Sequence, residues 1–275
     1  MTNEYCCPRG VRKVFGFPDI HWAVRDPQAL AVATRAHALF RPDLTVFGGD
    51  LVDASPFARH PRRKYNEGDY DFISHELEPL RGWIDRVQDQ TRGGRLAVLM
   101  GNHDDWLERW SIAAGIGHSL ASLRPSVYLF GKRRSTQVVP FGRMAGNSPT
   151  FFMLTPTLIV VHGWVSNKYA AEAHLRMASP YSIVFHHTHR MEYLATTRCD
   201  GTVAVGMSPG CLTRKVPVYS HGGSPTGWVH GFWVAFLGKT SFTMYQVPIV
   251  EGVCVLPDGT SVKEPPPREP PHEAA

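Results

Sequence analysis

One stretch constrains the fold more than any other: the apolar run 96–99, which Met100 and then Gly101-Asn102-His103-Asp104 follow. An apolar run of this length that ends at a glycine is typical of a buried strand. Such a strand delivers the next polar residues to a sheet edge, where open α/β sheets hold their ligands. Asparagine offers an oxygen to a hard cation, and histidine moves protons near neutral pH. Taken alone, Asn102 is equally explained as the cap of a following helix.

The same pattern recurs after other apolar runs, and this favours the chemical interpretation. Carboxylate, imidazole and amide oxygen suit Mn, Fe, Zn or Ni, and the lack of thiolates argues against a closed structural zinc site. Seven candidate ligands are more than one ion needs, whereas one carboxylate can bridge two ions about 3.5–4 Å apart. The candidates at the five strand ends are Asp19 and His21, Asp50, Asn102, His162, and His187 and His189.

Periodicity along the chain predicts an α/β fold. Strand 11–17, helix 26–40 and strand 44–47 form a unit whose connection implies a right-handed parallel crossover. Asp26 and Pro27 are a helix cap and a first helical residue, and Pro79 should kink or split a helix over 69–87. Further helices are expected over 105–123 and 168–178, and further strands over 127–130, 137–141, 151–154, 158–161, 183–185, 190–196, 202–207, 228–237 and 241–247.

Charge, cysteine content and the distribution of apolar residues limit the possible partners, compartment and domain organisation. A formal net charge of +5 and a pI near 9.0 lean towards anionic partners such as nucleic acid or phosphorylated substrates. Five cysteines without CxxC spacing fit a reducing compartment, so we expect a cytoplasmic protein. No stretch approaches the ~18 apolar residues of a membrane span. We expect an N-terminal extension over 1–10, one domain over 11–262, and a disordered Pro/Glu-rich tail over 263–275.

Five motifs resemble those of the calcineurin-like metallophosphoesterases, in the order of that family. The resemblance covers roughly residues 11 to 250 and implies a four-layer αββα sandwich of two mixed β-sheets flanked by helices. It also implies that Asp19, His21 and His189 hold one ion, that Asn102, His162 and His187 hold the other, and that Asp50 bridges them. The motifs are Asp19-Ile20-His21, Gly49-Asp50-Leu51-Val52-Asp53, Gly101-Asn102-His103-Asp104, His162-Gly163 and His187-Thr188-His189.

The chain departs from the family pattern at two positions that supply no ligand. Pro18 and His186 stand where the family usually has glycine, and only His187 and His189 reproduce the His-x-His spacing. Other departures disfavour the protein Ser/Thr phosphatases of the superfamily, which carry Gly, Arg-Gly and Glu where this chain has Trp22, Ala54-Ser55 and Asp104. The resemblance is greater to the phosphodiesterase and nuclease members.

The implied mechanism uses two divalent ions, with manganese the first choice in vitro, and a bridging hydroxide that attacks phosphorus in line. His103 would stabilise or protonate the leaving oxygen, and Asp104 would orient His103. The basic residues Arg62, Arg63 and Lys64 are either a solvated linker or a rim that contacts a phosphodiester or nucleic-acid substrate. A phosphomonoesterase and a non-catalytic metal-binding scaffold stay open as alternatives. The sequence indicates no membrane partner and leaves the oligomeric state open.

Overall fold

The first of two main sheets is built mostly from the N-terminal half of the chain, with two strands added from the C-terminal part. The computed structural model describes residues 5–58, 71–142, 150–215 and 227–264. In the order β11-β10-β1-β2-β3-β4, the last four strands are parallel, whereas β10 and β11 run antiparallel to their neighbours. These strands are β1 (Lys13–Phe17), β2 (Leu44–Phe47), β3 (Leu96–Leu99), β4 (Thr136–Val139), β10 (Gly231–Leu237) and β11 (Phe242–Pro248).

The second sheet has the order β5-β6-β7-β9-β8. Its three inner strands are parallel, and the two outer strands are antiparallel to the strands beside them. Both sheets are therefore mixed, and the predicted hairpin 151–161 is present as β5 and β6. These strands are β5 (Phe152–Thr155), β6 (Leu158–Val161), β7 (Ser182–Phe185), β8 (Met191–Thr197) and β9 (Val203–Pro209).

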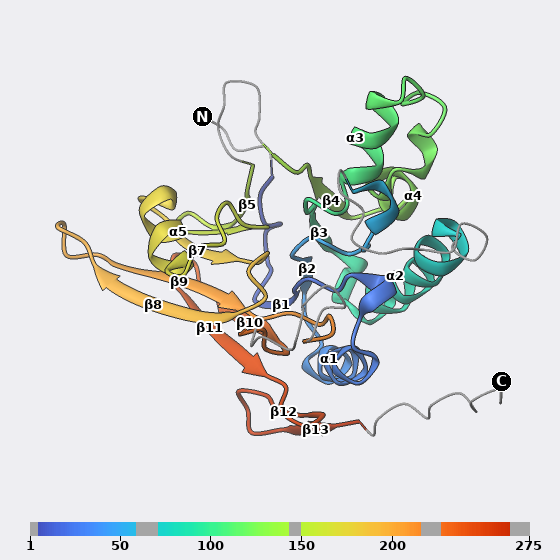
Figure 1. The fold of residues 1–275 in the computed structure, drawn as a ribbon. Coiled ribbons are helices and arrows are strands. Elements are labelled where there is room, and N and C mark those ends of the chain that lie inside the picture. The colour runs from blue at the N-terminus through green and yellow to red at the C-terminus, as the bar shows by residue number, and fades with distance from the viewer. Residues whose placement is uncertain (1–4, 59–70, 143–149, 216–226, 265–275) are drawn as a thin grey trace.

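Helices cover the outer face of each sheet, and the two inner faces pack together. Because strand residues alternate between faces, Phe15 and Phe17 of β1 enter the core beneath the helices, while Val14 enters the core between the sheets. In Figure 1 α5 lies on one side of the sheets, and α1, α2 and α4 lie on the other. The predicted four-layer α/β fold is confirmed. The helices are α1 (Pro27–Phe40), α2 (Glu78–Gln90), α3 (Trp106–Ala113), α4 (Pro125–Phe130) and α5 (Ala170–Ala178).

Local sequence signals predicted the start of α1 and an irregularity in the helix around Pro79. The Asp26 side chain accepts a hydrogen bond from the Ala29 N–H at 2.8 Å, so α1 has the predicted cap. Near Pro79, where a kink or a split was expected, the helix is not split: a π-helical turn, Ile73–Leu77, runs directly into α2. Proline lacks an N–H and its ring collides with the carbonyl four residues earlier, which breaks the regular α-helical ladder.

Two predictions for the segment after β3 are wrong. The expected helix 105–123 ends as α3 at Ala113, because Gly115 adopts a φ of 73° and turns the chain. The expected strand 127–130 is instead part of α4, which Pro125 begins and which buries Leu129 and Phe130. An apolar run of four residues carries no periodicity that distinguishes a strand from one turn of helix.

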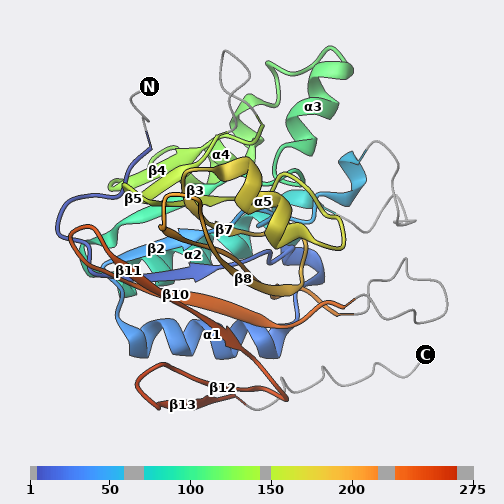
Figure 2. The ribbon, with the colours of Figure 1, turned by 90° about the vertical axis from the view of Figure 1, so that its left-hand side faces the viewer.

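A short hairpin after β11 was not predicted. β12 (Val253–Val255) and β13 (Ser261–Lys263) pair antiparallel, and the hairpin lies alongside α1 (Figure 2). The predicted tail boundary is therefore too early, since Lys263 ends β13 and the Glu264 carboxylate forms an ion pair with Arg35 at 3.1 Å. The rest of that tail, 265–275, lies outside the described residues. No described helix has both the length and the apolar character needed to cross a membrane.

Candidate metal centre

The predicted metal ligands all follow the carboxyl ends of β1, β2, β3, β6 and β7. The first three of these strands are parallel neighbours, and so are the last two. Backbone hydrogen bonds join the loops across the sheets: the Ile20 and His21 N–H groups donate to the Asp50 oxygen, and the His186 N–H donates to the His162 oxygen. The topology thus brings residues from five segments to one edge of the sandwich, as predicted.

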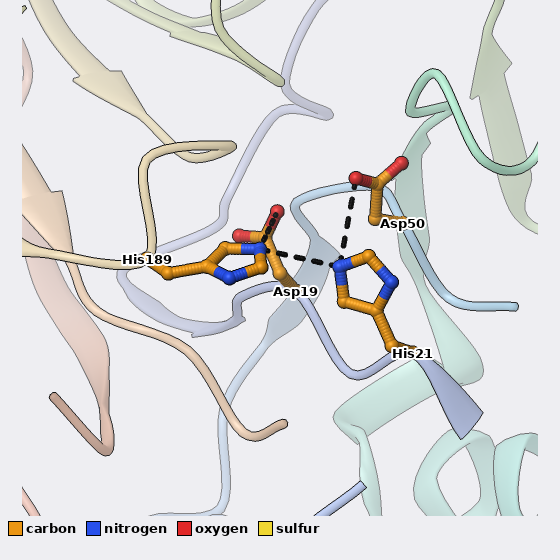
Figure 3. Close-up of side chains that lie close together, drawn as sticks. All are labelled: Asp19, His21, Asp50 and His189. Atoms are coloured by element: carbon orange, nitrogen blue, oxygen red, sulfur yellow. Dashed lines mark hydrogen bonds and ion pairs between the residues drawn. The ribbon is translucent and has the colours of Figure 1, made fainter. Parts of the chain in front are cut away.

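One cluster contains Asp19, His21, Asp50 and His189, whose candidate ligand atoms all lie within 4.8 Å of one another. The Nε2 atoms of His21 and His189 are 3.2 Å apart, and His189 Nε2 is 3.4 Å from Asp19 Oδ1. Figure 3 shows both imidazoles turned towards the same point, with Asp50 beside them. All four residues are buried. They include the three ligands expected for the first ion, together with the expected bridging residue.

A second cluster contains Asp50, His162 and His187, again within 4.8 Å of one another. The Asn102 Oδ1 atom lies 3.2 Å from His162 Nε2, so the amide adds a fourth donor to this cluster. His162 Nδ1 donates a hydrogen bond to the Gly48 backbone oxygen at 2.8 Å. The other ring nitrogen, Nε2, is therefore the one that could ligate a metal ion. The structure therefore brings together the four residues expected around the second ion.

Asp50 is the residue that the two clusters share. Its Oδ1 atom accepts a hydrogen bond from the His103 N–H at 2.9 Å. Its Oδ2 atom lies 3.7 Å from His21 Nε2 and 3.3 Å from His162 Nε2. A Cβ on Gly101 would lie 2.1 Å from Asp50 Oδ1, so only glycine allows this approach. The carboxylate is thus fixed by one oxygen while the other faces both clusters.

The backbone at this edge has the unusual conformations that are common at functional sites. Four of the seven predicted ligands adopt left-handed φ values: His21 at 47°, Asp50 at 49°, His187 at 71° and His189 at 59°. Each such residue costs of order 1–3 kcal/mol, and clusters of them occur at active sites and ligand clamps. The surrounding sheet edges hold these residues in conformations that isolated peptides rarely adopt.

The buried carboxylates of the two clusters favour positive charge beside them. Burial alone would raise the pKa of Asp50, but the neighbouring His162 holds it well below its usual range. Burial lowers the pKa of His162, yet the charge of Asp50 and the contact between the two raise it to about 10. Asp50 therefore stays ionised and favours the protonated forms of His162 and His21. Divalent cations would replace those protons, so metal binding would release protons to solvent.

The donor atoms fit two hard or borderline divalent ions. Ligands 2.0–2.2 Å from one ion lie about 3–3.4 Å from each other in octahedral or tetrahedral geometry. Three separations agree with that range: His21 Nε2 to His189 Nε2 at 3.2 Å, His189 Nε2 to Asp19 Oδ1 at 3.4 Å, and Asn102 Oδ1 to His162 Nε2 at 3.2 Å. Carboxylate, imidazole and amide donors without thiolate exclude a closed structural zinc site but not a catalytic one.

His103 lies beside the first cluster and contacts residues that the sequence had not assigned to it. Its Nδ1 atom donates to the backbone oxygen of Asp53 at 2.7 Å, and the Asp53 Oδ1 atom is 4.0 Å away. Trp106 lies against the imidazole, with ring centroids 3.7 Å apart. Asp53 Oδ1 also lies 3.7 Å from His21 Nδ1, so one carboxylate approaches both histidines. The sequence signal for this contact is the second aspartate of the Gly-Asp-x-x-Asp motif, which the predicted ligand set does not use.

The orienting role predicted for Asp104 does not match its contacts. Its Oδ1 atom accepts hydrogen bonds from the Leu51 and Val52 N–H groups at 3.0 and 3.2 Å, and Oδ2 accepts from the Gly101 N–H at 2.8 Å. These three bonds end on backbone N–H groups and not on the His103 imidazole. Asp104 thus joins the loops after β2 and β3, and Asp53 takes the place expected for it beside His103.

Two further buried groups support the loops. Glu76, in the π-helical turn before α2, accepts hydrogen bonds from the Asp53 and Ala54 N–H groups. Burial and then the charge of Asp53 raise the pKa of Glu76 to about 8. His186 donates from Nδ1 to the Val161 oxygen at 2.8 Å and accepts from the Trp233 indole at 3.2 Å. The spare histidine is therefore a core residue with both nitrogens satisfied, which resolves the ambiguity in the last motif.

The predicted rim of Arg62, Arg63 and Lys64 lies outside the described residues, so its position relative to the metal centre stays a prediction.

Comparison with known proteins identifies one family and several distant structural relatives. The family model for calcineurin-like phosphoesterases matches residues 12–193. No curated protein matches the chain. Vps29 from Chaetomium thermophilum is 12% identical over 87% of this chain and 92% of that chain, with a TM-score of 0.45. A single mutant of Vps29 from Entamoeba histolytica is 13% identical over 87% and 94%, with a TM-score of 0.43. YfcE, a phosphoesterase from E. coli, is 15% identical over 85% and 98%, with a TM-score of 0.39.

Proposed function

Because the chain belongs to the calcineurin-like phosphoesterase family, we propose that it is a phosphodiesterase or nuclease that works with two divalent metal ions. The observation that carries the proposal is the position of Asp50, whose Oδ2 atom faces His21 on one side and His162 on the other. A carboxylate placed in this way suits a two-ion site rather than a single one. Manganese is the first ion to test, and iron, zinc and nickel follow from the same donor set.

Asp19, His21 and His189 would hold one ion, Asn102, His162 and His187 would hold the other, and Asp50 would bridge them. When bound, such ions supply Lewis-acid activation of water and neutralise charge as phosphorus is attacked in line. The protein's own contribution is to fix these donors: the His187 N–H donates to both Asp19 oxygens, at 3.1 and 3.2 Å, and the His103 N–H donates to Asp50.

His103 is the candidate for proton transfer to the leaving oxygen. Its Nδ1 donates to the Asp53 oxygen, so Nε2 is the atom left to exchange a proton. Burial lowers the pKa of His103 to about 4, which keeps the imidazole neutral before substrate binds. An anionic phosphoester beside the ring favours the imidazolium form and raises that pKa. General acid assistance of this kind contributes about 10²–10⁴ in rate.

A substrate screen tests the proposal. The purified protein, loaded with Mn²⁺, is offered bis-p-nitrophenyl phosphate, p-nitrophenyl phosphate, and single- and double-stranded nucleic acid. Metal-dependent cleavage of the diester or of nucleic acid supports the phosphodiesterase or nuclease function. Faster cleavage of the monoester supports a phosphomonoesterase instead. Bound metal without turnover on any ester supports the scaffold alternative. A cytoplasmic location is proposed with the function and rests on the five free cysteines.

A further inference from the structure

A cavity of about 210 Å³ lies next to the second metal cluster. His162, a predicted ligand of that cluster, forms part of its wall. The rest of the wall comes from the ends of β3 and β4, from Thr150 just before β5, from the segment after β6, and from α5. A group that enters the cavity is therefore adjacent to the site where the phosphoester would bind.

Two aromatic side chains of the wall, Phe141 and Trp164, pack against neighbouring residues. Phe141 meets the His162 ring edge to face, with centroids 5.9 Å apart, and the Arg109 guanidinium lies 5.6 Å from the Phe141 ring centre. Trp164 is stacked on the His174 ring at 5.7 Å, and its backbone N–H donates to His174 Nε2 at 2.9 Å. Both aromatic walls exist before any ligand arrives, so binding a flat ring costs little ordering entropy.

The cavity offers apolar contact rather than charge. Its described lining contains no acidic residue and no lysine or arginine, and Met100 and Met177 add flexible thioether contacts. Thr150, the hydroxyl residue of the wall, already donates to the Pro140 and Gly142 oxygens at 2.8 and 3.1 Å. An apolar cavity of about 150 Å³ holds a benzene ring, so this one has room for one substituted or fused ring.

We propose that this cavity binds a planar aromatic ring of the phosphoester substrate, either a nucleobase or an aryl group, and thereby selects aromatic esters. The inference rests on the proposed function, because the cavity becomes a substrate subsite only through its contact with the metal centre. The ring would lie between Phe141 and Trp164, and the attached phosphoryl group would reach the ions held near His162.

Isothermal titration of adenosine and of phenol, with and without Mn²⁺, tests the proposal without requiring turnover. Trp164→Ala removes one wall. Met177→Trp enlarges a side chain that lines the cavity from α5, at a position that is half exposed. Tyr193→Ala is the matched control, because Tyr193 is an exposed aromatic on β8 that does not line this cavity.

We expect at least one of the two compounds to bind, and Trp164→Ala and Met177→Trp to weaken it fivefold or more, about the loss of one ring-stacking contact. Tyr193→Ala should bind like the parent. Tighter adenosine binding identifies a nucleotide ester, and tighter phenol binding identifies an aryl ester. If neither compound binds below about 10 mM, or if both cavity variants bind like the parent, the inference is wrong. Ring binding that the two cavity variants weaken, without turnover of any ester, would count against the phosphoesterase function and would leave the cavity as a ring-binding site.

Discussion

His103 donates its Nδ1 proton to the backbone oxygen of Asp53 at 2.7 Å, and its ring lies beside that of His21, a predicted metal ligand, with ring centroids 4.4 Å apart. The contact fixes one tautomer and leaves Nε2 as the exchanging nitrogen. His103 belongs to neither of the two clusters that share Asp50, so we expect it to transfer a proton and not to hold an ion.

We predict that His103→Ala keeps both metal ions but lowers kcat by about two to four orders of magnitude. The measurement is kcat beside the metal content of the same preparation. His118→Ala, at an exposed histidine in the turn after α3, is the control and should match the parent. Equal losses of metal and of rate would instead make His103 a ligand.

Asp50→Asn should abolish turnover and reduce the bound metal, because the amide no longer neutralises charge between two cations. Elemental analysis of the purified variant measures the metal directly. Asp89→Asn, which changes an exposed carboxylate on α2, should retain both metal and activity. Parent-like metal content and rate in Asp50→Asn would remove Asp50 from the site.

The nature of the substrate can be tested through the basic residues Arg62, Arg63 and Lys64. If the substrate is a polynucleotide and these residues contact its phosphates, each contact contributes a log–log salt slope of about −0.7 to −0.9. Changing all three to alanine should then weaken nucleic-acid cleavage and flatten its salt dependence, while bis-p-nitrophenyl phosphate is cleaved nearly as before. Unchanged cleavage of nucleic acid at every salt concentration would leave the segment as a linker and favour a small monoester.

The sequence predicted the grouping of the ligands because each one directly follows an apolar strand. Parallel strands present their carboxyl ends at a common edge, so the prediction needed only the order of strands and not side-chain contacts. The family resemblance then divided the residues into two sets, and the distances around Asp50 agree with that division.

What could not be predicted depends on contacts between distant segments. The partners of Asp104 include Leu51 and Val52, and no local pattern around residue 104 indicates that its carboxylate turns towards the β2 loop. The strand predicted over 127–130 is a helix because Pro125 starts a turn that buries Leu129 and Phe130, and four apolar residues fit either structure. The hairpin β12–β13 was missed because its strands are short and are stabilised by packing on α1.

The buried His37 makes stability depend on pH. Its Nε2 atom lies 2.8 Å from Thr45 Oγ1, and burial lowers its pKa from 6.5 to about 4. Between these values the unfolded chain binds more protons than the folded one, so stability rises with pH. The contribution, about 3 kcal/mol, is fully present above pH 6.5 and is lost as the pH falls to 4.

His37→Gln should remove this dependence. The free energy of unfolding is measured with urea for parent and variant between pH 8 and 4. The parent value minus the variant value should fall by up to about 3 kcal/mol over this range, because only the parent loses stability through His37. A difference that is constant with pH would show that His37 is protonated equally in both states.

The contacts of Asp104 lead to a prediction that separates support of the loops from orientation of His103. Asp104→Asn keeps the size of the side chain but presents an NH₂ group to one of the backbone N–H donors at Leu51, Val52 and Gly101. Leaving a buried donor without an acceptor costs about 1–3 kcal/mol. We therefore expect urea denaturation to show a loss of that size.

Metal affinity should fall with stability in Asp104→Asn, because the loops that Asp104 joins carry Asp50 and Asn102. If Asp104 oriented the imidazole instead, the variant would keep the parent's stability and metal content and lose only kcat. Stability, metal content and kcat measured on one preparation distinguish the two roles. The observed bonds favour the first, since all three of them end on backbone N–H groups of the loops after β2 and β3.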